Sequence, residues 1–149
     1  MVWLVEYEAG ELTARAPGAA DTLSTPEEAV QLRIRADRTA LRADGLQVLQ
    51  LEAALLDAAD RPARDEVIRC QILGDLALMG LENGRPDDLT AYSEPFRLTR
   101  EGTLTAYFRA GRAAGTASIH FRTDSGLHAV QKIRLVPEQD EQKQNGRLT

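Results

Sequence analysis

The stretch TLTAYFR, residues 103–109, decides the fold class of this chain. It mixes β-branched and aromatic residues in partial alternation, which is typical of a strand with one buried face and one face in water. A second stretch of the same kind, ASIHFRT at residues 117–123, follows a glycine-containing turn, and residues 127–136 place valine and isoleucine among polar side chains. We therefore predict three successive strands in the second half of the chain.

The first half also carries strand and turn signals. Residues 30–35, VQLRIR, alternate apolar and polar positions and predict another strand with one wet face. Turn signals recur roughly every 10 to 20 residues without a long linker or an internal repeat, which favours a many-stranded antiparallel domain. These signals are Pro17-Gly18, Asp44-Gly45, Asp60-Arg61-Pro62, Asn83 to Pro86, Glu101-Gly102, residues 111–115 and Ser125-Gly126.

Two segments are ambiguous between helix and strand. In residues 24–28, Thr25 would be an N-cap, Pro26 the first helical residue and Glu28 the end of a capping box. Residues 46–59 place Leu and Ala along one helical stripe, but the same residues alternate with polar ones as in a strand, between flanking turn signals. The 22 Ala and 20 Leu against 12 Val plus Ile favour helix. On pattern alone both alternatives stay open.

Composition limits the class of protein. The chain has 149 residues, 43% hydrophobic and 28% charged, which suits one globular domain. Leu, Ile, Val and Phe together number 35, enough for a folded core. The net charge of −5 argues against a nucleic-acid or anionic-membrane surface, because phosphate contacts need concentrated Lys and Arg. No apolar run approaches the roughly 20 residues of a membrane span. We expect neither nucleic acid nor membrane as a partner.

The two ends of the chain carry further signals. The apolar first five residues are followed by Glu6 and Glu8, which does not fit a secretory signal, so a cytoplasmic location is slightly favoured while the compartment stays open. Residues 138–149 contain almost no apolar side chains. We expect a domain over residues 1–137 followed by a disordered polar tail over residues 138–149.

The sequence gives little indication of a metal site or a redox-active site. Cys70 alone cannot form an intrachain disulfide, and with His120 and His128 it makes too small a set for a zinc or iron–sulfur site. We expect no metal, no cofactor and a buried, unreactive Cys70 thiol. The histidines lie in or beside strands without a recognisable nucleophile elbow, which indicates ordinary sheet residues. The glycines of residues 111–115 lack the lysine and the helix of a phosphate loop and indicate a turn.

Four blocks occur in a fixed order along the chain. They are the opening segment 3–14, the turn–strand–Asp–turn pattern of residues 41–62, the glycine-spaced segment 74–87 with its Asn-Gly-Arg-Pro-Asp ending, and the strand-rich segment 101–127. In order and spacing, these blocks resemble the C-terminal immunoglobulin-like domain of β-galactosidase-type enzymes of glycoside hydrolase family two. The resemblance covers residues 3–136. The chain departs from it at Glu27-Glu28 and Ala59-Asp60, where members often have glycine.

The resemblance implies an all-β fold, a single immunoglobulin-like antiparallel β-sandwich, in which residues 24–28 and 46–59 are extended. It also implies that the catalytic carboxylates sit on a separate (β/α)-barrel that this chain lacks, so no catalytic residue is carried over. The expected function is that of a non-catalytic accessory domain of a bacterial β-galactosidase-like hydrolase. Its role would be structural, docking beside the catalytic barrel, and its partners would be the other domains of the parent.

Asp87 and Asp88 are the obvious carboxylate pair for sugar chemistry. Neighbours in an extended chain point to opposite sides, however, and glycoside hydrolysis needs two carboxyls roughly 5 to 10 Å apart across the sugar ring. Following Asn83-Gly84 and Pro86, these aspartates are expected to cap a solvated turn, with calcium ligation as the minor alternative.

The alternative function is that of a carbohydrate-binding module that holds the parent near its glycan substrate. Sugar rings stack on exposed aromatic side chains and need a few convergent polar groups. Trp3 and Tyr7 would share one side of an extended first strand, and Tyr92 follows Asn83-Gly84. The candidate glycan contacts are therefore Trp3, Asn83 and Tyr92, unless Trp3 packs at a domain junction or in the core and Tyr7 closes the sandwich. A free-standing adhesion sandwich without an enzyme parent also stays open.

Overall fold

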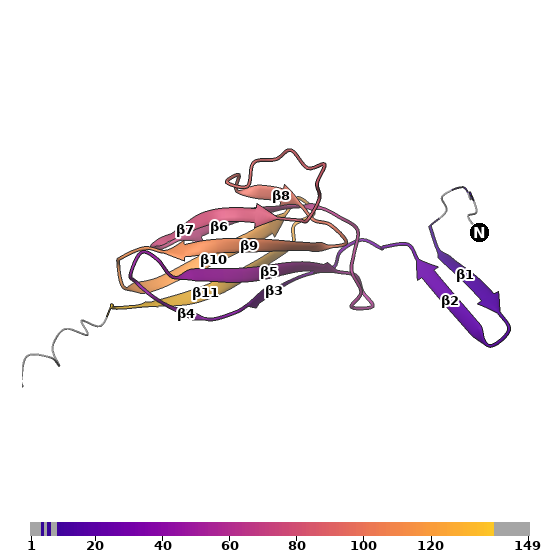
Figure 1. Cartoon of the computed structure of the whole chain (residues 1–149), viewed down its shortest axis with the longest axis horizontal. Helices are drawn as coiled ribbons and strands as arrows, with labels where there is room; N and C mark the ends of the chain where they lie inside the picture. Colours follow the sequence, from indigo (N-terminus) through magenta and orange to yellow (C-terminus); the bar gives the residue numbers. More distant parts are fainter. Residues whose placement is uncertain (1–3, 5, 7–8, 139–149) are drawn as a thin grey trace, which may run out of the picture.

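The computed structural model describes residues 4, 6 and 9–138, and this part of the chain forms strands and no helix (Figure 1). Two sheets pack face to face. The five-stranded sheet runs β4 (Ala40–Arg42), β11 (His128–Val136), β10 (Gly115–Thr123), β6 (Val67–Leu73) and β8 (Phe96–Leu98), and the four-stranded sheet runs β3 (Gln31–Ala36), β5 (Val48–Leu56), β9 (Thr103–Ala110) and β7 (Leu76–Glu82). Apart from the parallel β4–β11 pair, the pairings are antiparallel. The predicted immunoglobulin-like β-sandwich is confirmed.

The core lies between the two sheets and is built largely by alternation of inward and outward side chains along the strands. Along β9, Leu104, Ala106 and Phe108 are each at most 1% exposed, while the residues between them face outward. Phe108 meets Phe121 of β10 edge to face, with 6.4 Å between ring centroids and 74° between ring planes. The three strands predicted in the second half are confirmed as β9, β10 and β11, and they supply both layers of this core.

The ambiguous segment 46–59 forms the central strand β5. Its Leu49, Leu51, Ala53 and Leu55 are completely buried, whereas Leu46 before the strand is 74% exposed. β5 pairs with β3 on one side and β9 on the other, so partners distant in sequence satisfy its backbone groups. Pairing with these distant strands outweighs the helix propensity of residues 46–59, so the segment forms a strand.

The helix start indicated by residues 24–28 does not form, and the chain there is extended as the sandwich requires. The Thr25 hydroxyl accepts a hydrogen bond from the Gly10 amide at 2.7 Å, and the Thr25 amide donates to the Gly10 carbonyl at 2.9 Å. The side chain that would have capped a helix instead closes the base of a hairpin. The Arg64 amide donates to the Glu27 carbonyl at 2.7 Å, which ties this segment to the sandwich.

That hairpin is a two-stranded sheet of its own, made of β1 (Glu11–Ala16) and β2 (Ala19–Ser24). Figure 1 shows it extending from one end of the sandwich. Every residue of both strands is exposed. Leu12 and Leu23 lie directly opposite each other and are 57% and 71% exposed. Among the described strands, β1 and β2 pair with each other alone.

The turn after β5 shows how the chain manages without an expected glycine. Buried Asp57 accepts hydrogen bonds from the amides of Ala59 at 2.9 Å and Arg61 at 3.0 Å, and from the Arg61 guanidinium at 3.1 Å. The Arg61 amide, more than the other donors, holds the pKa of Asp57 below its ordinary value. Asp60 adopts the left-handed conformation with φ of 61°, which aspartate tolerates better than most residues.

In residues 4, 6 and 9–138 no helix is long and apolar enough to cross a membrane.

Candidate functional site

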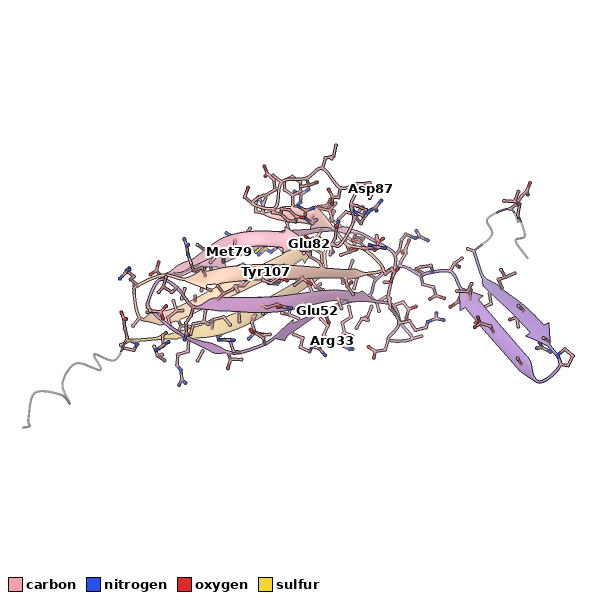
Figure 2. All side chains as sticks on the ribbon, in the orientation of Figure 1. Arg33, Glu52, Met79, Glu82, Asp87 and Tyr107 are labelled. Carbon is pink, nitrogen blue, oxygen red and sulfur yellow. The ribbon has the colours of Figure 1, made fainter. Side chains whose placement is uncertain are left out.

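The outer face of the four-stranded sheet carries aromatic and apolar side chains next to carboxylates. Tyr107 lies on this face because its neighbours Ala106 and Phe108 point into the core. Its partners across the strands are Gln50 of β5 and Gly80 of β7. Figure 2 shows Tyr107, Met79, Glu82 and Glu52 on this sheet. Three strands therefore contribute to one surface.

A β-bulge in β7 determines which of its residues reach this surface. The pairing with β9 shifts between Leu78 and Gly80, so Met79 is an extra residue in the ladder. In an unbroken alternation from Leu78, the next leucine, Leu81, would face outward. With the bulge, Leu81 is fully buried, and Met79 (49% exposed) and Glu82 both lie outside the core. The bulge thus places the Glu82 carboxylate on the outer face, beside Met79, which alternation from Leu78 already turns outward.

A hollow of about 400 Å³ opens on this face. Its lining is almost wholly apolar or aromatic and contains a single formal charge, the Glu82 carboxylate. The lining residues are Val48, Met79, Gly80, Glu82, Tyr92 and Tyr107. Gly80 lets the loop approach closely, since a Cβ on it would lie 3.3 Å from the Tyr92 Cβ and 3.4 Å from the Tyr92 carbonyl oxygen.

Tyr92 is held in place although its side chain is 61% exposed. The Leu81 amide donates to its carbonyl at 3.0 Å, which fastens the loop to β7. The Arg97 guanidinium lies 5.0 Å from the centre of its ring, and Arg97 is itself 2% exposed. The neighbouring Glu82 carboxylate raises the pKa of the Tyr92 phenol. An exposed aromatic ring is thereby fixed beside a carboxylate.

Arg97 is in turn fixed by the loop 83–95. It forms an ion pair with Asp88 at 3.0 Å and donates to the Thr90 carbonyl at 2.6 Å. The hydrogen bond from the Thr90 amide, helped by Asn83 and Arg97, lowers the pKa of Asp88 strongly. Asp88 is therefore a structural carboxylate that braces the support under Tyr92.

The three predicted glycan contacts lie in different situations. Tyr92 is on the surface of the hollow. Asn83 is 8% exposed, and its amide nitrogen donates to Asp88 at 2.7 Å and to the Leu98 carbonyl at 2.9 Å, while its oxygen accepts from the Arg85 amide at 3.0 Å. These bonds occupy Asn83 within the loop. Trp3, like Tyr7, lies outside the described residues.

The other candidates are placed as follows. Asp87 is exposed and pairs with Arg85 at 3.2 Å, so the two aspartates have separate partners. His120 Nδ1 lies 3.2 Å from His128 Nε2, and His120 Nε2 lies 3.1 Å from the Ser118 hydroxyl. Cys70 is half-buried on β6, and burial raises the pKa of its thiol to about 12. Within the part of the chain that the structure describes, no three His, Cys, Asp or Glu side chains gather to hold a metal.

Sequence reasoning missed Met79, Glu82 and Tyr107. A signal for Tyr107 was available, since it alternates with the apolar residues of 104–108 and must lie on the wet face of that strand. Met79 likewise alternates with Leu76 and Leu78, but no such signal exists for Glu82, because its placement depends on a bulge in the pairing with β9.

Comparisons with known proteins agree with this architecture. The family model described as Glycoside hydrolase family 2 C-terminal domain 5 matches residues 32–131. A beta-galactosidase of Bacteroides ovatus is 24% identical over 140 residues, which are 89% of this chain and 16% of that protein.

Two solved structures have the same fold. A glycosyl hydrolase family 2 member from Bacteroides cellulosilyticus superposes with a TM-score of 0.70 at 23% identity, covering 93% of this chain and 19% of that one. A beta-glycosidase from Bacteroides vulgatus gives a TM-score of 0.70 at 20% identity, covering 89% and 18%. The chain spans less than a fifth of the length of each relative.

Proposed function

The chain belongs to the family Glycoside hydrolase family 2 C-terminal domain 5, and on that premise we propose that it is a non-catalytic accessory domain that docks beside the catalytic barrel of a β-galactosidase-like hydrolase. The resemblance noted in the sequence is confirmed at the level of the family. The docking role, the parent and its substrate are the proposal.

The observation that carries the docking role is the β1–β2 hairpin. A two-stranded ribbon is marginally stable in water unless a third strand or another element covers one of its faces. Here both strands are exposed along their whole length, and the opposed pair Leu12 and Leu23 faces solvent. Covering this pair with a neighbouring domain would bury the leucines and order the ribbon.

Three carboxylates in the turns and loops of the sandwich support a non-catalytic role. Hydrolysis of a glycoside needs one carboxyl group as an acid and a second as a base or nucleophile, both facing the sugar. Asp57 and Asp88, whose pKa values are lowered, accept backbone hydrogen bonds within turns, and Asp65 accepts from Thr99 and the Gly102 amide. These groups hold loops in shape.

The docking role is tested in the longer protein encoded by the reading frame that contains this chain. An upstream catalytic barrel is expected in the same frame. The double substitution Leu12→Asp with Leu23→Asp should lower the melting temperature of that longer protein and leave that of the 149-residue chain unchanged. Leu89→Asp, at a residue 95% exposed on another loop, is the matched control and should change neither. An unchanged longer protein, or the lack of any barrel in the frame, would contradict docking.

Catalysis is tested on the chain by itself. The 149-residue protein should release no nitrophenol from nitrophenyl β-galactoside above the buffer rate. Activity that persists after repeated purification and is lost on unfolding would overturn the non-catalytic assignment.

The second candidate, carbohydrate binding, is favoured by one observation. Tyr92 presents an exposed ring beside an apolar hollow, supported from behind by buried Arg97. Asn83 contributes to that support, because its amide nitrogen donates to Asp88 and to the Leu98 carbonyl within the loop.

A further inference from the structure

The hollow between β5, β9 and β7 offers surfaces of two kinds. Val48, Met79, Tyr92 and Tyr107 give it apolar and aromatic walls. Glu82 gives it a strong hydrogen-bond acceptor. Gln50, which is paired with Tyr107, and Glu52, which is paired with Thr105, lie on the same face of the sheet. A ligand that fits must have an apolar face and must donate hydrogen bonds from its edge.

The charge of the lining narrows the ligand further. Glu82 is the one charged group among the lining residues, and no cationic side chain is among them. Arg97 lies behind the Tyr92 ring and already pairs with Asp88. Arg109, the cross-strand partner of Val48 on the same face, lies outside the lining. Within the lining, a phosphate, a carboxylate or a uronic acid would therefore meet the Glu82 charge without a cation to offset it. The complementary ligand is neutral.

The size of the hollow and its rigidity favour a small ligand. Its volume of about 400 Å³ falls in the range of small-molecule sites, which runs from about 300 to 1,000 Å³. Tyr92 is fixed by its contact with Arg97 and by the Leu81 hydrogen bond, and Tyr107 stands on the central pair of strands. Side chains that are ordered before binding lose little conformational entropy when a ligand arrives.

We propose that this hollow binds a neutral pyranose ring of a glycan. The C–H face of the sugar packs against Tyr107 and Met79, the Tyr92 ring flanks it, and Glu82 accepts hydrogen bonds from hydroxyl groups on the ring edge. This sugar site rests on the second candidate function, carbohydrate binding, and names its ligand class and contacts. It does not depend on the docking role, since docking rests on the hairpin and the sugar site on the sheet face.

The chain provides its own reporter for the test. It has two methionines, Met1 and Met79, so labelling with ¹³C at the methionine methyl group gives two signals, and Met79→Leu assigns them. Methyl β-D-galactopyranoside is titrated into the 149-residue protein at pH 7. We expect a saturable shift of the Met79 signal with a millimolar dissociation constant and no shift of the Met1 signal. Methyl β-D-glucuronide should bind at least about fivefold more weakly, because its carboxylate faces Glu82.

Variants separate the ring contacts from mere folding effects. Tyr107→Ala should weaken galactoside binding about tenfold, whereas Tyr107→Phe, which keeps the ring, should stay within about twofold. Glu82→Gln should weaken galactoside binding and reduce the preference over the glucuronide. Leu89→Ala, on the 83–95 loop but outside the lining, is the matched control and should bind normally. Amide dispersion in each variant confirms that the sandwich is intact.

Three results would overturn the sugar site. They are no Met79 shift at tens of millimolar galactoside, equal affinity for galactoside and glucuronide, or unchanged binding by a folded Tyr107→Ala. None of them affects docking, which is measured separately through the hairpin variants in the longer protein.

Discussion

The sandwich and the β1–β2 hairpin use the same backbone pairing but differ in how they are held. In both regions antiparallel strands exchange hydrogen bonds in regular register. In the sandwich, each central strand also buries one face, as Leu51 and Phe108 do completely, whereas no residue of the hairpin strands is buried. The difference teaches that pairing sets the direction of the chain, while removal of apolar surface from water supplies the stability.

The largest expected effect comes from removing a ring that joins the two sheets. Phe108→Ala deletes one side of the edge-to-face contact with Phe121 and leaves a cavity, so it should lower the free energy of unfolding by about 3–5 kcal/mol. Urea denaturation followed by far-ultraviolet circular dichroism measures this loss of stability. A loss under about 1 kcal/mol would mean that the sheets are not held by this core.

The second-largest expected loss of stability distinguishes two glycines with similar φ angles. Gly102, with φ of 73°, lies so close to β5 that a Cβ would be 2.9 Å from the Leu55 carbonyl oxygen. Gly18, with φ of 81° in the hairpin turn, has nothing within 4 Å. Gly102→Ala should cost about 1–3 kcal/mol of global stability through conformational strain and the close contact. Gly18→Ala carries a similar backbone strain, but in the turn of a hairpin whose strands bury no residue, so the global unfolding midpoint should stay unchanged. Equal losses in the two variants would contradict the comparison.

Acid should lower the stability of the sandwich by protonating carboxylates in its turns. The folded-state pKa of Asp57 lies below its ordinary value near 3.8, so folding favours the charged form. The resulting stability is fully present above that ordinary value and is lost as the pH falls from about 5 through the lowered pKa. Asp57→Asn should therefore flatten the fall in melting temperature between neutral and acid pH. Asp21→Asn on the exposed hairpin serves as the control, and a steeper fall in Asp57→Asn would reverse the sign we infer.

The smallest expected effect is in the hairpin itself. Leu12→Ala with Leu23→Ala should change the global stability of the 149-residue chain by less than about 0.5 kcal/mol, because neither side chain is buried there. Hydrogen exchange provides a second measurement. Amides of residues 11–24 should exchange far faster than those of β9, and equal protection in the two regions would show that something in the chain covers the hairpin.

Much of the sandwich could be predicted from the sequence because period-two alternation survives in its central strands. Residues 103–109 and 117–123 carry that signal directly. For residues 46–59 the same leucines satisfy a helical and an extended pattern, and β3 and β9 decide between them from more than a dozen residues away. The capping box at Thr25 failed for a similar reason, since its hydroxyl found Gly10 and not the amide of a helix.

The candidate site was only partly predictable. Tyr92 was picked out as an exposed aromatic residue and lies on the hollow. Asn83 belongs to the same sequence motif, but its short amide reaches Asp88 and the Leu98 carbonyl inside the loop. Cross-strand neighbours such as Tyr107 and Gly80 meet only after two strands have paired, and a chain read in one dimension does not contain that pairing.

The bulge at Met79 has a consequence at the level of the gene. Because this residue has no partner in the ladder, deleting its single codon would leave Leu78 opposite Phe108 and Gly80 opposite Tyr107, as they are now. Every later residue of β7 would keep its side of the sheet, whereas removing a codon from almost any other point in a strand turns inside residues outward. Deletion or insertion of this one codon therefore removes or adds a surface methionine and leaves the inward and outward faces of β7 unchanged. Related domains can differ in length at this position.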